Sequence, residues 1–149
     1  MDPVTGLPTR DRLVGAIDEM IAAGDEPVAF VVAIEGISAP DAGGDLEADS
    51  ALGKALREVA SRLSAMVRGV DVLAAPSVGR FGLAGSGIEV EDTAIVEQRI
   101  RGAFALPTDV GAGMVALSVS IGHSRWLPGH DGRALVAAAE ANLDHKGQR

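Results

Sequence analysis

Apolar positions along this 149-residue chain follow two spacings, one typical of buried strands and one of amphipathic helices. The run 28–34 is short, unbroken and rich in β-branched residues, which predicts a central strand buried on both faces. Over about 50–67 the apolar residues instead recur every three or four positions, which predicts the longest helix. Its apolar stripe consists of Leu52, Leu56, Val59, Leu63 and Met66.

Shorter segments with the same two spacings complete the expected order of elements. The first is a helix over about 9–24 with Thr9 or Asp11 as its cap, and a loop is expected over 36–49. Strands over 71–75 and 79–84 are joined by 76–78 as a β-hairpin. A helix over 92–104 capped by Asp92, a strand over 115–122 and an alanine-rich helix over 132–145 follow. The core order is therefore β-α-β-β-α-β. This order predicts an α+β fold of the ferredoxin-like kind, with helices packed on one face of a mostly antiparallel sheet.

Length and composition narrow the class of protein. The chain fits one domain over 1–149, and 47% hydrophobic with 23% charged residues is typical of a globular protein. A net charge of -8, with three Phe, one Trp and no Tyr, argues against extended nucleic acid as a partner. A small anionic nucleotide stays compatible with this charge, because two or three local arginines suffice to hold it.

The chain has no cysteine, which excludes disulfides, thiolate metal sites and cysteine nucleophiles and fits a reducing compartment. The three histidines lack the spacing of a metal site, so we expect them at the surface. No apolar run is long enough to span a bilayer, and the first residues do not form a signal peptide. We therefore expect a cytoplasmic domain, whose parent protein could be membrane-anchored through other segments.

Four local sequences resemble, in order, the GGDEF (diguanylate cyclase) family. Residues 2–10 resemble its D-x-L-T-G-L-P-N-R opening, and 56–63 resemble its long helix. Residues 118–122 (S-V-S-I-G) resemble its V-S-I-G strand, and 139–143 are similar to its A-D-x-A-L closing helix. The resemblance covers nearly the whole chain. It implies a polymerase-like palm in which two divalent metal ions join two GTP molecules into cyclic di-GMP within a homodimer.

The five-residue signature of the family is strongly altered in this chain. Alignment through Asp71 places Ser77, Val78, Gly79, Arg80 and Phe81 at the positions of G-G-D-E-F. Phe81 alone matches the family. The resemblance gives the two family glycines the role of letting the hairpin backbone approach the nucleotide, and Val78 disfavours the positive φ that glycine allows.

The acids that the family uses for its metal ions are also missing. Ala33 stands at the aspartate that ends the first strand, and Gly79 stands at the acidic third position of the signature. Arg80 reverses the charge of the fourth position. Glu35 remains at the second acidic position of the strand, but one carboxylate cannot hold two metal ions. We therefore expect no metal cofactor, and Mg²⁺ only if the domain is an enzyme after all.

The loop after the first strand carries the guanine-contacting residues of the family, and its register is ambiguous. An insertion of about three residues would place Gly44 and Asp45 at the family's N-D pair, and Gly53 at another base-contacting aspartate. Base recognition is then lost as well. Asp41 or Asp45 as a relocated metal ligand is the alternative that would preserve an enzyme.

A second site of the family, the inhibitory site for cyclic di-GMP, has its motif intact. Arg68 and Asp71 form an R-x-x-D pair at the family's distance before the signature, and Arg99 matches an arginine of the following helix. Guanidinium groups can bind phosphates and the guanine edge bidentately, and the carboxylate can accept from guanine N–H groups. The alternative is a solvated pair that caps the end of a helix.

Two other arginines carry competing interpretations. Arg80 is expected as an exposed strand residue, with a new anion site on the hairpin as the alternative. Arg10 belongs to the opening motif, where the resemblance implies a structural role in seating the first helix.

Taken together, these residues favour a catalytically inactive, regulatory GGDEF-like domain of a bacterial signalling protein that binds cyclic di-GMP through Arg68, Asp71 and Arg99, or that transmits signals by contact alone. The alternatives are a divergent cyclase that uses Glu35 with a relocated acid, and a domain that binds GTP in the altered active-site groove. The resemblance also implies sensor or effector domains as partners, and a homodimer.

Overall fold

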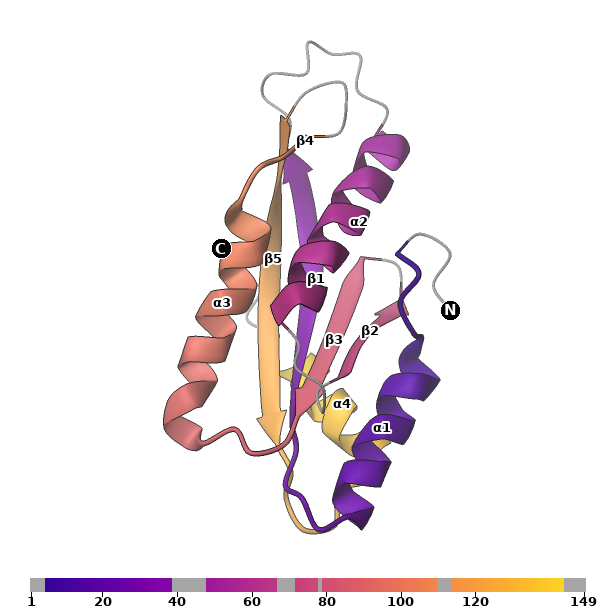
Figure 1. The fold of residues 1–149 in the computed structure, drawn as a ribbon, viewed down its shortest axis with the longest axis vertical. Coiled ribbons are helices and arrows are strands. Elements are labelled where there is room, and N and C mark those ends of the chain that lie inside the picture. The colour runs from indigo at the N-terminus through magenta and orange to yellow at the C-terminus, as the bar shows by residue number, and fades with distance from the viewer. Residues whose placement is uncertain (1–4, 39–47, 67–71, 78, 110–113, 144–149) are drawn as a thin grey trace.

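An antiparallel sheet in the order β2-β3-β1-β5-β4 forms the centre of the computed structural model, which describes residues 5–38, 48–66, 72–77, 79–109 and 114–143 (Figure 1). The strands are β1 (Val28–Ser38), β2 (Val72–Ser77), β3 (Arg80–Gly85), β4 (Thr108–Asp109) and β5 (Met114–Arg125). The helices are α1 (Arg10–Ala22), α2 (Ala48–Met66), α3 (Thr93–Ala105) and α4 (Gly132–Ala141), with a short 3₁₀ turn, η1 (Val90–Asp92), before α3.

β1 is the central strand, antiparallel to both β3 and β5. All of its residues from Val28 to Ala33 are buried, which confirms the prediction of a strand covered on both faces. The hairpin of β2 and β3 and the order β1-α2-β2-β3-α3-β5 are those of the ferredoxin-like fold, so the predicted fold class is confirmed.

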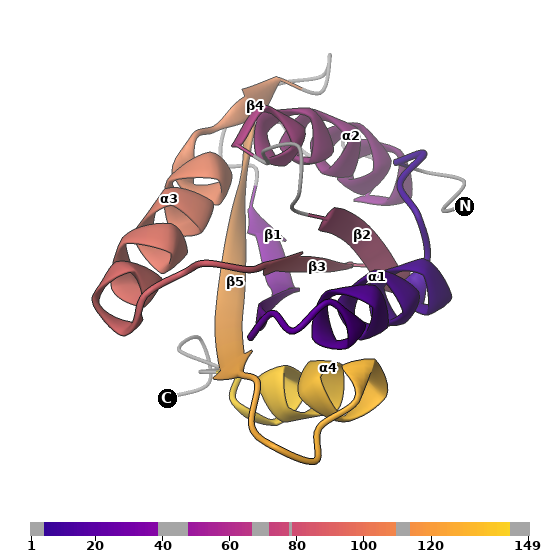
Figure 2. The ribbon, with the colours of Figure 1, turned by 60° about the horizontal axis from the view of Figure 1, so that its bottom comes forward.

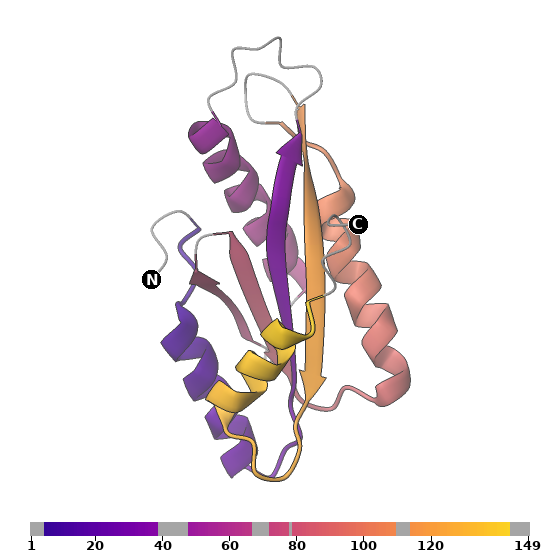
Figure 3. The same cartoon turned by 180° about the vertical axis from the view of Figure 1, so that it is seen from behind.

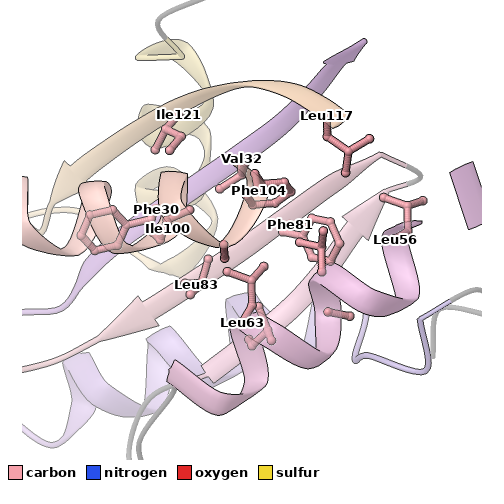
Figure 4. Packing of buried hydrophobic residues seen from close by; sticks show 14 of the residues in the cluster. Phe30, Val32, Leu56, Leu63, Phe81, Leu83, Ile100, Phe104, Leu117 and Ile121 are labelled. Carbon is pink, nitrogen blue, oxygen red and sulfur yellow. The ribbon is translucent and has the colours of Figure 1, made fainter. Parts of the chain in front are cut away.

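One face of the sheet packs against α2 and α3. Alternate β1 residues, Phe30 and Val32 among them, point into this layer together with Phe81 of β3 (Figure 4). Phe81 and Phe104 of α3 lie edge to face with their ring centroids 5.7 Å apart, a favoured geometry for aromatic pairs. The one signature residue that matches the family is therefore a core residue.

The opposite face packs against α1 and α4, which Figures 2 and 3 show lying side by side across the sheet. Ala29, Val31 and Ala33 of β1 point into this second layer. The expectation that helices cover one face was wrong, because it considered only the two helices inside the β-α-β-β-α-β core. The first and last helices of the chain close the other face, so the domain has three layers.

Several element ends differ from those expected. β1 continues to Ser38 where the sequence suggested a loop, and α4 ends at Ala141 rather than near residue 145. Asp92 occupies the N-cap position of α3 but makes no side-chain capping hydrogen bond, because the chain enters the helix through the turn η1. Thr9 likewise lies at the N-cap position of α1, and its side chain makes no capping hydrogen bond. Both residues therefore lie at the cap positions, but the expected capping hydrogen bonds were wrong.

α2 and α3 are joined by one arginine. Arg62 of α2 donates hydrogen bonds to the carbonyl oxygens of Ala103, Leu106 and Pro107 at 2.9 to 3.2 Å. Carbonyl groups at the end of a helix have no partner within the helix, so a guanidinium group satisfies several of them at once. Arg62 thereby fixes the end of α3 against α2.

In the described part of the chain, no helix is both long and apolar enough to cross a membrane.

Candidate functional site

The structure brings the altered acidic positions together at the end of β1 and the adjoining hairpin. Ala33 lies opposite Arg80 on β3 and opposite Ser120 on β5. Next to this row, the backbone N–H of Ile34 donates to the carbonyl oxygen of Gly79 at 2.8 Å. Ala33 on the first strand and the residues Gly79 and Arg80 aligned with the signature therefore lie side by side in the structure. Val78 lies outside the described residues.

The backbone conformation at Gly79 favours glycine independently of any metal chemistry. Its φ is +77°, in the left-handed region, and it sits at the turn between β2 and β3. A residue with a side chain is strained there, because its Cβ crowds the backbone. The turn thus takes its glycine at the third signature position, where the family has an acid.

Glu35 is the acidic side chain that this site retains. The pairing of β1 with β5 shifts register between Ile34 and Gly36, and the exposed Glu35 lies at this irregularity. The hydroxyl of Ser120, fully buried, donates to the Glu35 carboxylate at 2.6 Å. The carboxylate therefore reaches over the same face as Ala33.

The described residues of this site supply one carboxylate, from Glu35. Mg²⁺ at a two-metal centre needs several carboxylate oxygens, and here Glu35 stands beside an alanine, a glycine and an arginine. Within the described residues no group of three His, Cys, Asp or Glu side chains is placed to hold a metal ion. Asp41 and Asp45, the candidates for a relocated acid, lie outside the described residues.

Arg80 is engaged by a carboxylate from another element. Its Nη1 donates to Oε2 of Glu140 on α4 at 3.1 Å. Arg10, at the start of α1, donates through both terminal nitrogens to the two oxygens of the same carboxylate, each at 2.9 Å. We call Arg10, Glu140 and Arg80 the charge bridge. It ties the opening motif, the signature hairpin and the closing helix together, which gives Arg10 the structural contact that was expected of it.

Bidentate hydrogen bonds from Arg10 lower the pKa of the Glu140 carboxyl below its ordinary value of 4.5, although burial opposes this shift. A carboxyl whose pKa is lower in the folded state stabilises the fold above its ordinary pKa, and loses that effect as pH falls through the folded-state value. The stabilisation is therefore complete at neutral pH and lost in the acid range below about 4.5.

We expect Glu140→Gln to lower the free energy of unfolding near pH 7 by about 1 kcal/mol, because it leaves two arginines facing one neutral amide. The loss is small because both arginine side chains are more than a third exposed to solvent, which screens the interaction. As pH falls through the lowered pKa of Glu140, the variant and the original protein should converge. Urea denaturation at several pH values measures this, with the exposed Glu19→Gln as control; a difference that is constant with pH would contradict it.

A groove of about 710 Å³ lies on the other side of the sheet, between the end of α2, the end of β3 and α3. Arg99 lines it and is exposed. Arg68 and Asp71 lie outside the described residues. Met66 and Val72, the described residues on either side of that segment, both line the groove. The segment that carries Arg68 and Asp71 is thus flanked on both sides by residues that line one cavity.

Sequence reasoning missed three residues of these two sites. Glu140 and Ser120 each lie in a segment that resembles the family, but the resemblance gives neither a role in a site. Asp92 was predicted to cap a helix, and the structure shows that it also lines the groove. An acid at the motif position of Glu140 was the available signal for the charge bridge. No local pattern marks the other two, because each is defined by a contact or a cavity formed by distant segments.

A known family model covers the whole chain. The model described as "Diguanylate cyclase, GGDEF domain" matches residues 1–149. No curated protein matches the sequence.

Solved structures with the same fold include proteins from two bacteria. A sensory box/GGDEF family protein from Caulobacter crescentus CB15 is 26% identical with a TM-score of 0.75, over 95% of this chain and 94% of that one. The diguanylate cyclase SiaD from Pseudomonas aeruginosa, in complex with its activator SiaC, is 23% identical with a TM-score of 0.75, over 95% of this chain and 55% of SiaD. The coiled coil and GGDEF domain of DgcB from Caulobacter crescentus, in complex with c-di-GMP, is 22% identical with a TM-score of 0.72, over 95% and 76%.

Proposed function

Because this chain belongs to the GGDEF, or diguanylate cyclase, family, whose model matches residues 1–149, we propose that it is a regulatory member that does not make cyclic di-GMP. The observation that carries this proposal is the row Arg80–Ala33–Ser120 across three strands. In that row an arginine and an alanine stand where the resemblance places acids of a metal-dependent cyclase, and Ser120 is the serine of the matched V-S-I-G strand. A charge that is reversed at Arg80 repels divalent cations instead of binding them.

The ligand that we propose is cyclic di-GMP, held by Arg68, Asp71 and Arg99. The groove beside α3 supports this, since Arg99 and both neighbours of the 67–71 segment line it. DgcB, a protein of the same fold, was solved in complex with c-di-GMP. The groove lies across the sheet from the altered signature, so ligand binding there does not require the missing acids.

Two measurements on the same preparation test the proposal. With GTP and Mg²⁺ or Mn²⁺ we expect no cyclic di-GMP by chromatography. Isothermal titration should show binding of cyclic di-GMP, weakened at least tenfold by Arg68→Ala, which removes a charge-assisted bidentate contact. Arg57→Ala, an exposed arginine of α2 that does not line the groove, serves as control. Product formation would overturn the loss of catalysis, and absence of binding heat would leave a domain that acts by contact alone.

A divergent cyclase is the second candidate, and Glu35 is the observation that favours it. Its carboxylate lies over the Ala33 face, so one relocated acid would give two metal-binding carboxylates. The GTP reaction above decides between the candidates. A thermal shift with GTP, run with and without metal ions, separately detects a domain that binds GTP in the altered groove. In either case SiaD, whose structure contains an activator protein, is the precedent for proposing sensor or effector partners.

A further inference from the structure

The groove beside α3 has an apolar interior with charged groups on its helix side. The residues that line it include the apolar Phe30, Val72, Leu83, Ile88 and Val96, together with the small residues Ser86 and Gly87. Space is open beside Gly87, because a Cβ there would meet no atom within 4 Å. A flat aromatic ring such as a nucleobase buries both faces in a cavity of this kind, while its polar edge needs partners at the rim.

Asp92 and Arg99 stand at the same side of this groove. They are seven residues apart along η1 and α3, almost two helical turns, which places them on one face at a separation of roughly 10 Å. Both line the groove, with Ile95 and Val96 between them. Along η1 and α3 the groove thus meets the Asp92 carboxylate, then an apolar surface, then the Arg99 guanidinium group. This spacing is comparable to that between the base edge and the phosphate of one nucleotide.

The carboxylate of Asp92 has no hydrogen-bond partner among the described residues. An aspartate at an N-cap position ordinarily accepts from the backbone N–H groups of the first turn. Here the chain enters α3 through η1, and the side chain makes no such bond. Thr93 turns its hydroxyl to the carbonyl oxygen of Glu89 instead. The Asp92 acceptors are therefore available to a ligand in the groove.

We propose that Asp92 is a specificity-determining residue that binds the Watson–Crick edge of a guanine in this groove, while Arg99 pairs with the phosphate of the same nucleotide. The inference rests on the proposed binding of cyclic di-GMP, and it adds an acid that the R-x-x-D motif does not contain. A carboxylate with two acceptor oxygens matches the adjacent N1–H and N2–H donors of guanine.

The same geometry disfavours adenine. Adenine offers one N–H donor and an unprotonated ring nitrogen at the corresponding edge, so a carboxylate meets a donor and an acceptor side by side. Sites that pair with a specific donor reject the analogue that lacks it, because buried polar groups are left unpaired. Arg62 holds the C-terminal end of α3 on α2. Arg99 therefore lies on a helix that is anchored to the core, and Asp92 lies at the N-cap of the same helix.

The test compares Asp92→Asn with Glu91→Gln in the full chain. Glu91 is an exposed neighbour in η1 that does not line the groove. Isothermal titration with cyclic di-GMP should show a dissociation constant roughly 10- to 100-fold weaker for Asp92→Asn, the loss expected for hydrogen bonds to a charged group. Glu91→Gln should bind within about twofold of the original protein. Thermal midpoints of the two variants verify that both are folded.

The preference for guanine provides the second readout. The ratio of affinities for cyclic di-GMP and cyclic di-AMP should fall in Asp92→Asn and stay unchanged in Glu91→Gln. If Asp92→Asn binds cyclic di-GMP like the original protein while Arg68→Ala weakens it, the role of Asp92 is wrong and the proposed function stands. If the original protein binds no cyclic di-GMP, the role of Asp92 and the proposed ligand are both wrong, whereas the loss of catalysis is decided by the GTP reaction alone.

Discussion

A protein that carries Ala33→Asp together with Arg80→Glu is expected to bind Mn²⁺, whereas the original protein is not. Residues 33 and 80 face each other across β1 and β3, and directly opposed side chains have Cβ atoms about 5 Å apart. With Glu35 beside them, three carboxylates would then join Glu140 on the face that now holds the charge bridge. Gly79 is left in place, since its left-handed backbone does not favour a side chain.

Thermal denaturation with and without Mn²⁺ measures this gain. An ion present at about 100 times its dissociation constant stabilises by about 2.7 kcal/mol, which corresponds to roughly 5–10 °C for a domain of this size. Ala33→Asp alone is the matched control, because Arg80 remains to neutralise the new aspartate and should prevent metal binding. An equal Mn²⁺ response in the original protein, or none in the double variant, would show that the missing acids do not determine metal binding here.

Replacing Gly122 with alanine is expected to lower the free energy of unfolding by about 3 kcal/mol. Gly122 lies on β5 under the end of α4, where an added Cβ would collide with the carbonyl oxygen of Ala139 and lie 2.6 Å from the backbone nitrogen of Leu143. Both contacts are to backbone, which cannot rotate away as a side chain can. The strand and the closing helix would have to separate.

Gly102→Ala is the control with the opposite expected sign. Gly102 is exposed on α3, and no atom lies within 4 Å of a Cβ built there. Alanine in a helix interior is favoured over glycine by about 1 kcal/mol, so this variant should be slightly more stable. Urea denaturation of the two variants measures both effects. Equal stabilities would contradict the close packing of α4 on β5.

Local sequence was sufficient for the order of elements and for the family resemblance. The apolar run of β1 predicts a buried strand whatever surrounds it, because six consecutive residues from Val28 to Ala33 cannot remain in water. The sequence alone shows that Ala33, Gly79 and Arg80 carry no carboxylate, which holds in any fold. Element ends were less predictable, as the extension of β1 to Ser38 shows.

Contacts between distant segments required the tertiary structure. Arg10 and Glu140 are 130 residues apart, and their pairing depends on α1 and α4 packing side by side on one face of the sheet. The same packing placed helices on both faces, which no periodicity within a single helix specifies. Asp92 has the residue type of a cap, yet the turn before α3 makes it part of a groove. Local side-chain preferences determined the elements of this domain, and the arrangement of the helices around the sheet decided which charged groups meet.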